Sequence, residues 1–274
     1  IKVTQYPTDT KAFEGKITQI IGHKGEVGLD ILEVLYAMKI PQEFSAETLA
    51  EAESFSEELT QEDLQGREDY RNEITYTIDG EDSKDLDDAI HVKKLSNGHF
   101  ELGVHIADVS HYVTEGSSLN EEAYARATSV YVTDRVVPML PVRLSNNLCS
   151  LNEAQERLIM SCLMEIDDKG KIVTYKISPS VIKTTYRMTY SNVNKMIHQG
   201  QEGHREALEK FSKIADSIEV AVELHEILET MRKDRGMVEF DESEAKIILD
   251  DEGHPIEIVK RDRDTAERMI ESFM

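Results

Sequence analysis

Short stretches of alternating apolar and polar residues run through the middle of the chain. Residues 73–78, 89–92 and 100–106 are rich in Ile, Val and Tyr, with apolar side chains at or near every second position. This period of two is typical of strands that bury one face. Asn97-Gly98 lies between the second and third stretches, and this dipeptide favours a tight turn, so the sequence predicts a hairpin there.

A second, longer hairpin is predicted where residues 158–167 and 171–187 flank the turn at Asp168-Lys169-Gly170. Elsewhere the apolar residues recur three and four positions apart, which predicts helices. The expected helices cover residues 29–38, 45–54, 60–70, 119–127, 191–199, 206–234 and 265–274. Strands that pair mainly as antiparallel neighbours, followed by helices, predict an α+β fold, with a mostly antiparallel twisted sheet flanked by helices.

Two of the expected helices begin with capping signals. Ser45 suits the position before a helix because its hydroxyl can accept a backbone N–H. Thr60, followed three residues later by Asp63, resembles a capping box. Near the end of the chain, residues 237–240 and 245–249 are expected to pair as a further hairpin.

The chain divides into three parts by composition. Residues 1–22 suggest strand, turn and strand, too little for a domain and similar to the last hairpin of an OB-type β-barrel. Residues 23–72 are expected to form an acidic helical connector, since residues 42–73 contain eleven acidic and two basic residues. Residues 73–274 form the main domain. Both ends of the chain look cut, which suggests a fragment.

The composition limits the class of protein. The chain has 274 residues and a net charge of −23. It contains no apolar run of about eighteen residues, so no membrane partner is expected. Cys149 and Cys162 form no CxxC motif and suggest reduced thiols in a cytoplasmic protein; a monomer is the default expectation. The negative charge disfavours nucleic-acid binding, but the acidic residues are unevenly distributed and bound cations would cancel several of them.

The most informative segment is the run from Asp79 to Asp88, which holds five aspartates and one glutamate. The four residues that carry the hypothesis are Asp79, Asp85, Asp87 and Asp88. Crowded carboxylates repel one another, and oxygen ligands from aspartate suit Mg²⁺, Mn²⁺ or Ca²⁺. A cation site is therefore one interpretation, and a solvated acidic turn is the other. An EF-hand is excluded, because Lys84 and Ile90 occupy the positions that require Gly and Glu.

Three blocks together resemble a known family, the ribonuclease II/R exoribonucleases. These blocks are TIDGEDSKDLDDAI at residues 77–90, GVHIADVSHYV at 103–113, and RATSVYVTDRVVPMLPVRLSNNLCSLN at 126–152. Two further segments, at residues 187–193 and 235–250, extend the resemblance over about 200 residues. The first hairpin is similar to the end of that family's second cold-shock OB barrel.

The resemblance implies a processive 3′→5′ exoribonuclease that hydrolyses single-stranded RNA to 5′-nucleoside monophosphates with Mg²⁺, or with Mn²⁺. By position, the four aspartates match the family's catalytic, metal-binding carboxylates. Tyr131 matches a tyrosine that stacks on the 3′-terminal base, although its apolar neighbours also fit a core residue. Arg143 and Asn147 are candidate RNA contacts, with an ordinary surface loop as the alternative. A non-catalytic RNA-binding module of the OB or cold-shock class remains the competing hypothesis.

One family feature is absent from this sequence. The family carries a catalytic arginine in a Ser/Thr-Pro-Ile-Arg-Arg block downstream of the aspartates, and no such block occurs here. We therefore expect this chain by itself to have little or no hydrolytic activity.

Overall fold

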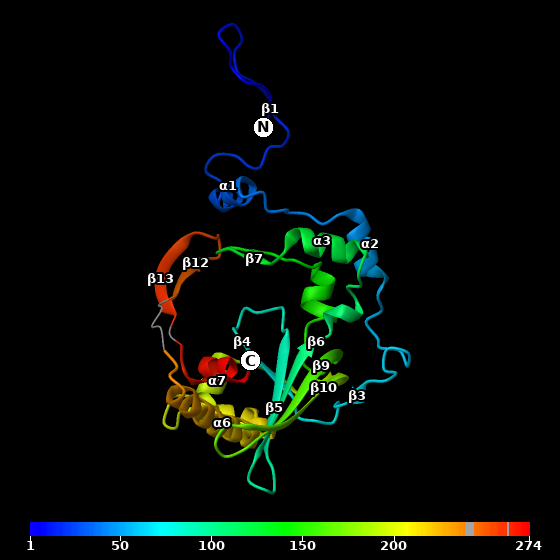
Figure 1. Ribbon diagram of the computed structural model, residues 1–274. Coiled ribbons are helices and arrows are strands. Elements are labelled where there is room, and N and C mark those ends of the chain that lie inside the picture. The colour runs from blue at the N-terminus through cyan, green and yellow to red at the C-terminus, as the bar shows by residue number, and fades with distance from the viewer. Residues whose placement is uncertain (239–243, 262) are drawn as a thin grey trace.

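The computed structural model describes residues 1–238, 244–261 and 263–274. A sheet of seven strands forms its centre, in the order β11-β4-β5-β6-β9-β10-β3 (Figure 1). The strands are β3 (Glu68–Asp69), β4 (Tyr76–Asp79), β5 (Asp88–Lys94), β6 (Phe100–Ala107), β9 (Glu156–Ile166), β10 (Ile172–Lys183) and β11 (Tyr186–Thr189). Most neighbours are antiparallel, whereas β11–β4 and β10–β3 are parallel. This confirms the predicted α+β fold and both central hairpins.

Two groups of helices cover the two faces of this sheet (Figure 1). One face packs against α4 (Tyr190–Ile197), α6 (Ala215–Asp234) and α7 (Thr265–Phe273), with Tyr76, Ile90 and Leu102 among the buried strand residues. The other face packs against α2 (Ala46–Ser54), α3 (Ser118–Arg126) and the π-helical turn η2 (Leu144–Leu148). Leu86, which lies within the aspartate run, belongs to this second core.

The N-terminal hairpin stands apart from the main body (Figure 1). It consists of β1 (Lys2–Gln5) and β2 (Glu14–Lys16), and β2 is shorter than the predicted extended stretch over residues 15–21. Its large side chains are exposed, including Tyr6 and Phe13. A two-stranded sheet without neighbours cannot bury such residues. The next element, α1 (Leu29–Ala37), confirms the predicted helix.

The capping signal at Ser45 is confirmed, whereas the helix predicted at residues 60–70 is wrong. The Ser45 hydroxyl accepts the Thr48 N–H at 3.1 Å and α2 follows. Thr60 and Asp63 do exchange the hydrogen bonds of a capping box. However, the chain then passes through turns to β3, which pairs with β10. Pairing with the sheet edge replaces the continuation of the helix.

The long helix predicted over residues 206–234 is interrupted. Instead, α5 (His204–Lys210) ends one residue before Phe211, and a 3₁₀ turn over Ser212–Ile214 precedes α6. Phe211 is buried and packs edge-on against Tyr186, 5.5 Å between ring centroids. We attribute the break to this packing, because a continuous helix would carry the ring to a different position. Local periodicity therefore located the helix but not its bend.

Besides the N-terminal hairpin, two short hairpins of the described residues lie outside the main sheet. One pairs β7 (Val130–Tyr131) with β8 (Val136–Val137), in a segment that the sequence predicted to be irregular at residues 136–141. The other pairs β12 (Glu244–Leu249) with β13 (Pro255–Arg261). The strand predicted at residues 237–240 lies partly outside the described residues, so its pairing with residues 245–249 stays a prediction. In the part of the chain that the structure describes, no helix has the length and hydrophobicity needed to cross a bilayer.

Candidate active site

The four candidate aspartates lie at and between the ends of two neighbouring strands. Asp79 is the last residue of β4 and Asp88 is the first of β5, so the connection over residues 80–87 leaves the sheet and returns to it. Asp85 and Asp87 lie on this connection, which we call the aspartate loop. Figure 1 shows it projecting from the strands towards the middle of the molecule.

The buried side chain of Leu86 determines on which side of the loop its neighbours Asp85 and Asp87 lie. Its side chain is 1% exposed and packs in the second core. Asp85 is partly buried and Asp87 is exposed. In an extended segment the two neighbours of a buried residue point away from it, so both carboxylates face outward. Burial of the leucine between them therefore places Asp85 and Asp87 on the same side of the loop.

The four carboxylates influence one another electrostatically. Burial and the nearby charge of Asp88 raise the pKa of Asp79 to about 7, against the opposing effect of Arg187. Although Asp87 is exposed as a whole, the protein partly desolvates its carboxylate, and this effect, together with the charges of Asp85 and Asp88, raises the pKa of Asp87 to about 6. Burial also raises the pKa of Asp88. Carboxylates that resist ionisation near neutral pH lack sufficient positive charge around them, which is the condition a bound cation would relieve.

The donor set fits a hard cation, although the side chains are not arranged around one. The Oδ2 atom of Asp79 is buried and has no hydrogen-bond partner among the described residues, an arrangement that is costly without a ligand. Elsewhere in the described ranges, too, no three His, Cys, Asp or Glu side chains converge closely enough to hold a metal. Cation binding therefore requires these carboxylates to rotate towards a common point.

Arg187 is a charged neighbour of the cluster that sequence reasoning missed. It lies on β11, whose parallel pairing places it opposite Thr77 on β4. Its guanidinium donates to the carbonyls of Glu81 and Ser83 in the aspartate loop, and its charge lowers the pKa of Asp79. Arg187 opens one of the segments that extended the family resemblance, but only the β11–β4 pairing assigns it this place.

The structure places Tyr131 at the cluster. Its side chain is 64% exposed, and its hydroxyl donates to Asp85 Oδ2 at 2.6 Å. This hydrogen bond raises the pKa of Tyr131 to about 12. The exposure argues against the alternative that Tyr131 is a core residue. Its ring is available to a ligand next to the carboxylates, and its role with RNA remains a prediction.

Arg143 and Asn147 make contacts within the protein. The Arg143 guanidinium donates to the carbonyls of Ala52 and Phe55 and to Glu57. Asn147 donates to the same glutamate at 3.0 Å. These donors fasten η2 to the end of α2, and they would have to leave these acceptors to bind RNA. The proposed RNA contacts at Arg143 and Asn147 stay predictions.

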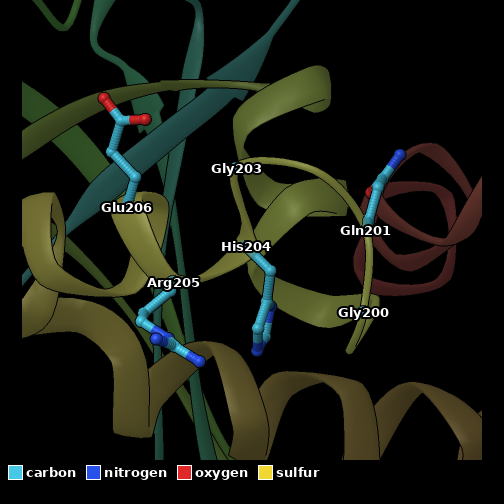
Figure 2. A pocket seen from close by; sticks show the side chains of 6 residues that line it. All are labelled: Gly200, Gln201, Gly203, His204, Arg205 and Glu206. Atoms are coloured by element: carbon cyan, nitrogen blue, oxygen red, sulfur yellow. The ribbon is translucent and has the colours of Figure 1, made fainter.

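A separate surface hollow lies between α4 and α5 (Figure 2). Its lining consists of the residues Gly200, Gln201, Gly203, His204, Arg205 and Glu206. None of the four aspartates lines it. His204 is fastened through Nδ1 to the Lys195 carbonyl at 2.8 Å, so this hollow belongs to the connection between two helices rather than to the cluster.

Family comparison agrees with the sequence blocks. The family described as RNB domain matches residues 67–274, and the family described as Cold shock domain matches residues 1–45. The chain therefore belongs to the RNB-domain family, as its sequence predicted.

Individual relatives within that family are ribonucleases R. Ribonuclease R 2 of Lactococcus lactis is 90% identical over 274 residues, which are 100% of this chain and 41% of that protein. The solved structure of Mycoplasma genitalium RNase R with double-stranded RNA matches 99% of this chain and 47% of its own, at a TM-score of 0.91 and 33% identity. The complex of the same enzyme with ribose-methylated single-stranded RNA matches 94% and 39%, at a TM-score of 0.84 and 34% identity. The chain thus spans less than half the length of these relatives.

Proposed function

We propose that this chain provides the carboxylate centre of a metal-dependent 3′→5′ exoribonuclease that degrades single-stranded RNA to 5′-nucleoside monophosphates. The observation that carries the proposal is the aspartate cluster, with its raised pKa values and the unpartnered Oδ2 of Asp79. Membership of the RNB-domain family and the RNA complexes of the Mycoplasma relative support it.

Asp79, Asp85, Asp87 and Asp88 would hold one or two Mg²⁺ ions, or Mn²⁺. When bound, such cations activate a water molecule and stabilise charge on the scissile phosphate and the leaving 3′ oxygen. The protein's own contribution is to hold the carboxylates on a fixed loop beside a neutralising arginine. Arg187 offsets part of their repulsion without contributing a ligand, since guanidinium is always protonated.

Tyr131 would hold the RNA end. Its ring is exposed, and its hydroxyl is fixed to Asp85. A base stacked on that ring would lie beside the carboxylates. Stacking suits an enzyme without sequence preference because every base presents a π face.

The test is hydrolysis of a 5′-labelled single-stranded oligoribonucleotide by the full-length protein, with the 274-residue chain assayed in parallel. We expect stepwise shortening from the 3′ end and release of 5′-monophosphates with Mg²⁺, and none with excess chelator. Binding without any cleavage, unaffected by chelator, would favour the competing RNA-binding module. The isolated chain is expected to be inactive, and measurable Mg²⁺-dependent trimming by it would contradict that expectation.

A further inference from the structure

One buried hydroxyl contacts the aspartate loop on both sides of Asp85. Ser150 is 0% exposed and follows η2 in the chain, 65 residues beyond Asp85. Its Oγ donates to the Lys84 carbonyl at 3.0 Å and accepts the Leu86 N–H at 3.0 Å. A hydroxyl can do both at one atom, and an aliphatic side chain can do neither.

These two hydrogen bonds flank Asp85. The Lys84 carbonyl belongs to the peptide group before Asp85, and the Leu86 N–H belongs to the peptide group after it. Fixing both peptide groups fixes the two backbone torsions of Asp85 and thus the direction in which its side chain leaves the backbone, while the carboxylate can still turn about its own side-chain bonds. Asp87 is held differently, because the Leu86 carbonyl accepts from Leu151 N–H at 2.9 Å and the Asp87 carbonyl accepts from Ala107 N–H at 2.9 Å.

Ser150 is itself held in place by a buried arginine. Arg157 is 4% exposed, and its Nε donates to the carbonyls of Ser150 and Asn147 at 3.0 Å each. A further nitrogen of Arg157 donates to Asn147 Oδ1 at 2.9 Å. The turn that carries Ser150 is therefore rigidly attached to β9, where Arg157 lies.

We propose that Ser150 is a positioning residue that holds the backbone of Asp85 so that its side chain leaves the loop in the direction needed for cation binding. Ser150 holds the backbone of Asp85 whether or not a cation is bound, and the consequence for cations rests on the proposed function. Side chains that orient metal ligands typically contribute 10–100-fold to metal affinity. Ser150→Ala should weaken Mn²⁺ binding by about tenfold, whereas the backbone contacts of Asp87 should remain.

The test uses two readouts on the 274-residue chain. Amide hydrogen exchange of Leu86 reports the geometry, and Mn²⁺ titration followed by electron paramagnetic resonance reports cation affinity. Ser161→Ala is the matched control, since Ser161 is also 0% exposed but its hydroxyl contacts His105 at 2.8 Å. We expect faster Leu86 exchange and weaker Mn²⁺ binding in Ser150→Ala only.

A second pair of variants separates the hydroxyl from its packing. Ser150→Thr and Ser150→Val add the same bulk, but only threonine keeps the hydroxyl, so threonine should bind Mn²⁺ more tightly than valine. Equal affinity in this pair, or unchanged Leu86 exchange in Ser150→Ala, would overturn the positioning role. If the wild-type chain binds no Mn²⁺ at these carboxylates, the proposed function fails instead, and Leu86 exchange still decides whether Ser150 holds the loop.

Discussion

At the scale of single residues, the cluster combines charged groups with an exposed aromatic ring. Tyr131 contributes a hydroxyl to Asp85 and leaves its ring open to solvent. The sequence could identify the tyrosine through the family blocks but not this hydrogen bond, because the partners are 46 residues apart and meet only in the fold. The ring and the hydroxyl therefore have separable roles.

Removing the ring should weaken RNA binding. Tyr131→Ala is expected to lose about 1–3 kcal/mol of binding free energy to a single-stranded oligoribonucleotide, the usual contribution of one stacked base. Tyr131→Phe keeps the ring and should retain most of the affinity. The RNA affinity of each variant is measured by fluorescence anisotropy of a labelled oligoribonucleotide, in buffer that contains Ca²⁺ or a chelator in place of Mg²⁺. Tyr124→Ala provides the control, since Tyr124 is 87% exposed on α3, and an equal loss in that variant would refute the assignment.

A buried histidine pair should make stability depend on pH. His105 is 0% exposed and bonds to His91 at 2.9 Å and Ser161 at 2.8 Å. Burial, with the His91 charge, lowers its pKa to about 3. Between pH 6.5 and about 3, His105 is protonated in the unfolded chain but stays neutral in the folded chain. The free energy of unfolding therefore decreases as the pH falls through this range.

The histidine effect is measurable as a difference between two proteins. From pH 7 to pH 5, wild type should lose ~1–2 kcal/mol more unfolding free energy than His105→Gln, which has no proton to gain. Urea unfolding at both pH values provides the comparison. Parallel losses in the two proteins would show that His105 is not responsible.

At the scale of elements, the sequence predicted what depends on neighbours along the chain. The Asn97-Gly98 turn, the long β9–β10 hairpin and the Ser45 cap all lie where the pattern placed them. The errors arose where distant residues compete with local preference. Residues 68–69 join β10 instead of extending a helix, and Phe211 breaks a helix to pack on Tyr186.

At the candidate site, too, the sequence identified residues that are close together along the chain and missed those that only the fold brings together. All four aspartates could be found from the sequence because they crowd into ten residues. Ser150 and Arg187 could not, since a lone serine and a lone arginine carry no local signal of the loop that they contact. For Arg143 the sequence was misleading in the other direction. An arginine in this position suggests phosphate binding, but its guanidinium donates to backbone carbonyls of the protein itself.

The central strands should not tolerate a larger residue at Gly103. A Cβ built there would overlap the imidazole ring of His91, which faces it across the β5–β6 pairing. Gly103→Ala should destabilise the fold by about 1–3 kcal/mol, the usual effect of overpacking. In the background His91→Ala the same change should cost less, because the ring is gone. Urea unfolding of the four proteins measures the coupling, and strictly additive effects would contradict the packing argument.

At the scale of the whole molecule, the net charge of −23 repels the phosphates of RNA. It also makes the crowding of ionised carboxylates in one loop unfavourable. Bound cations would reduce this opposition at the place where the phosphate must arrive. In this account, the cluster weakens the fold when cations are absent and stabilises it when they are bound.

Asp79→Asn tests this balance. Because the pKa of Asp79 is raised to about 7, its charge opposes folding above that pH, and the opposition disappears below about pH 4. At pH 8 without metal, Asp79→Asn should be about 1–3 kcal/mol more stable than wild type. Mn²⁺ should stabilise wild type, by about 2.7 kcal/mol at a hundred times its dissociation constant, and the variant much less. Equal Mn²⁺ effects on both proteins would place the cation elsewhere.

The most direct test of the central claim is the hydrolysis and RNA affinity of Asp87→Asn in the full-length protein. Asparagine keeps the size of the side chain but removes the charge that a cation requires. We predict that cleavage of single-stranded RNA with Mg²⁺ falls by at least about a hundredfold, which corresponds to ~2.7 kcal/mol of transition-state stabilisation, while RNA affinity stays within a few-fold of wild type. Unchanged cleavage would contradict the assignment of the aspartate cluster as the catalytic centre.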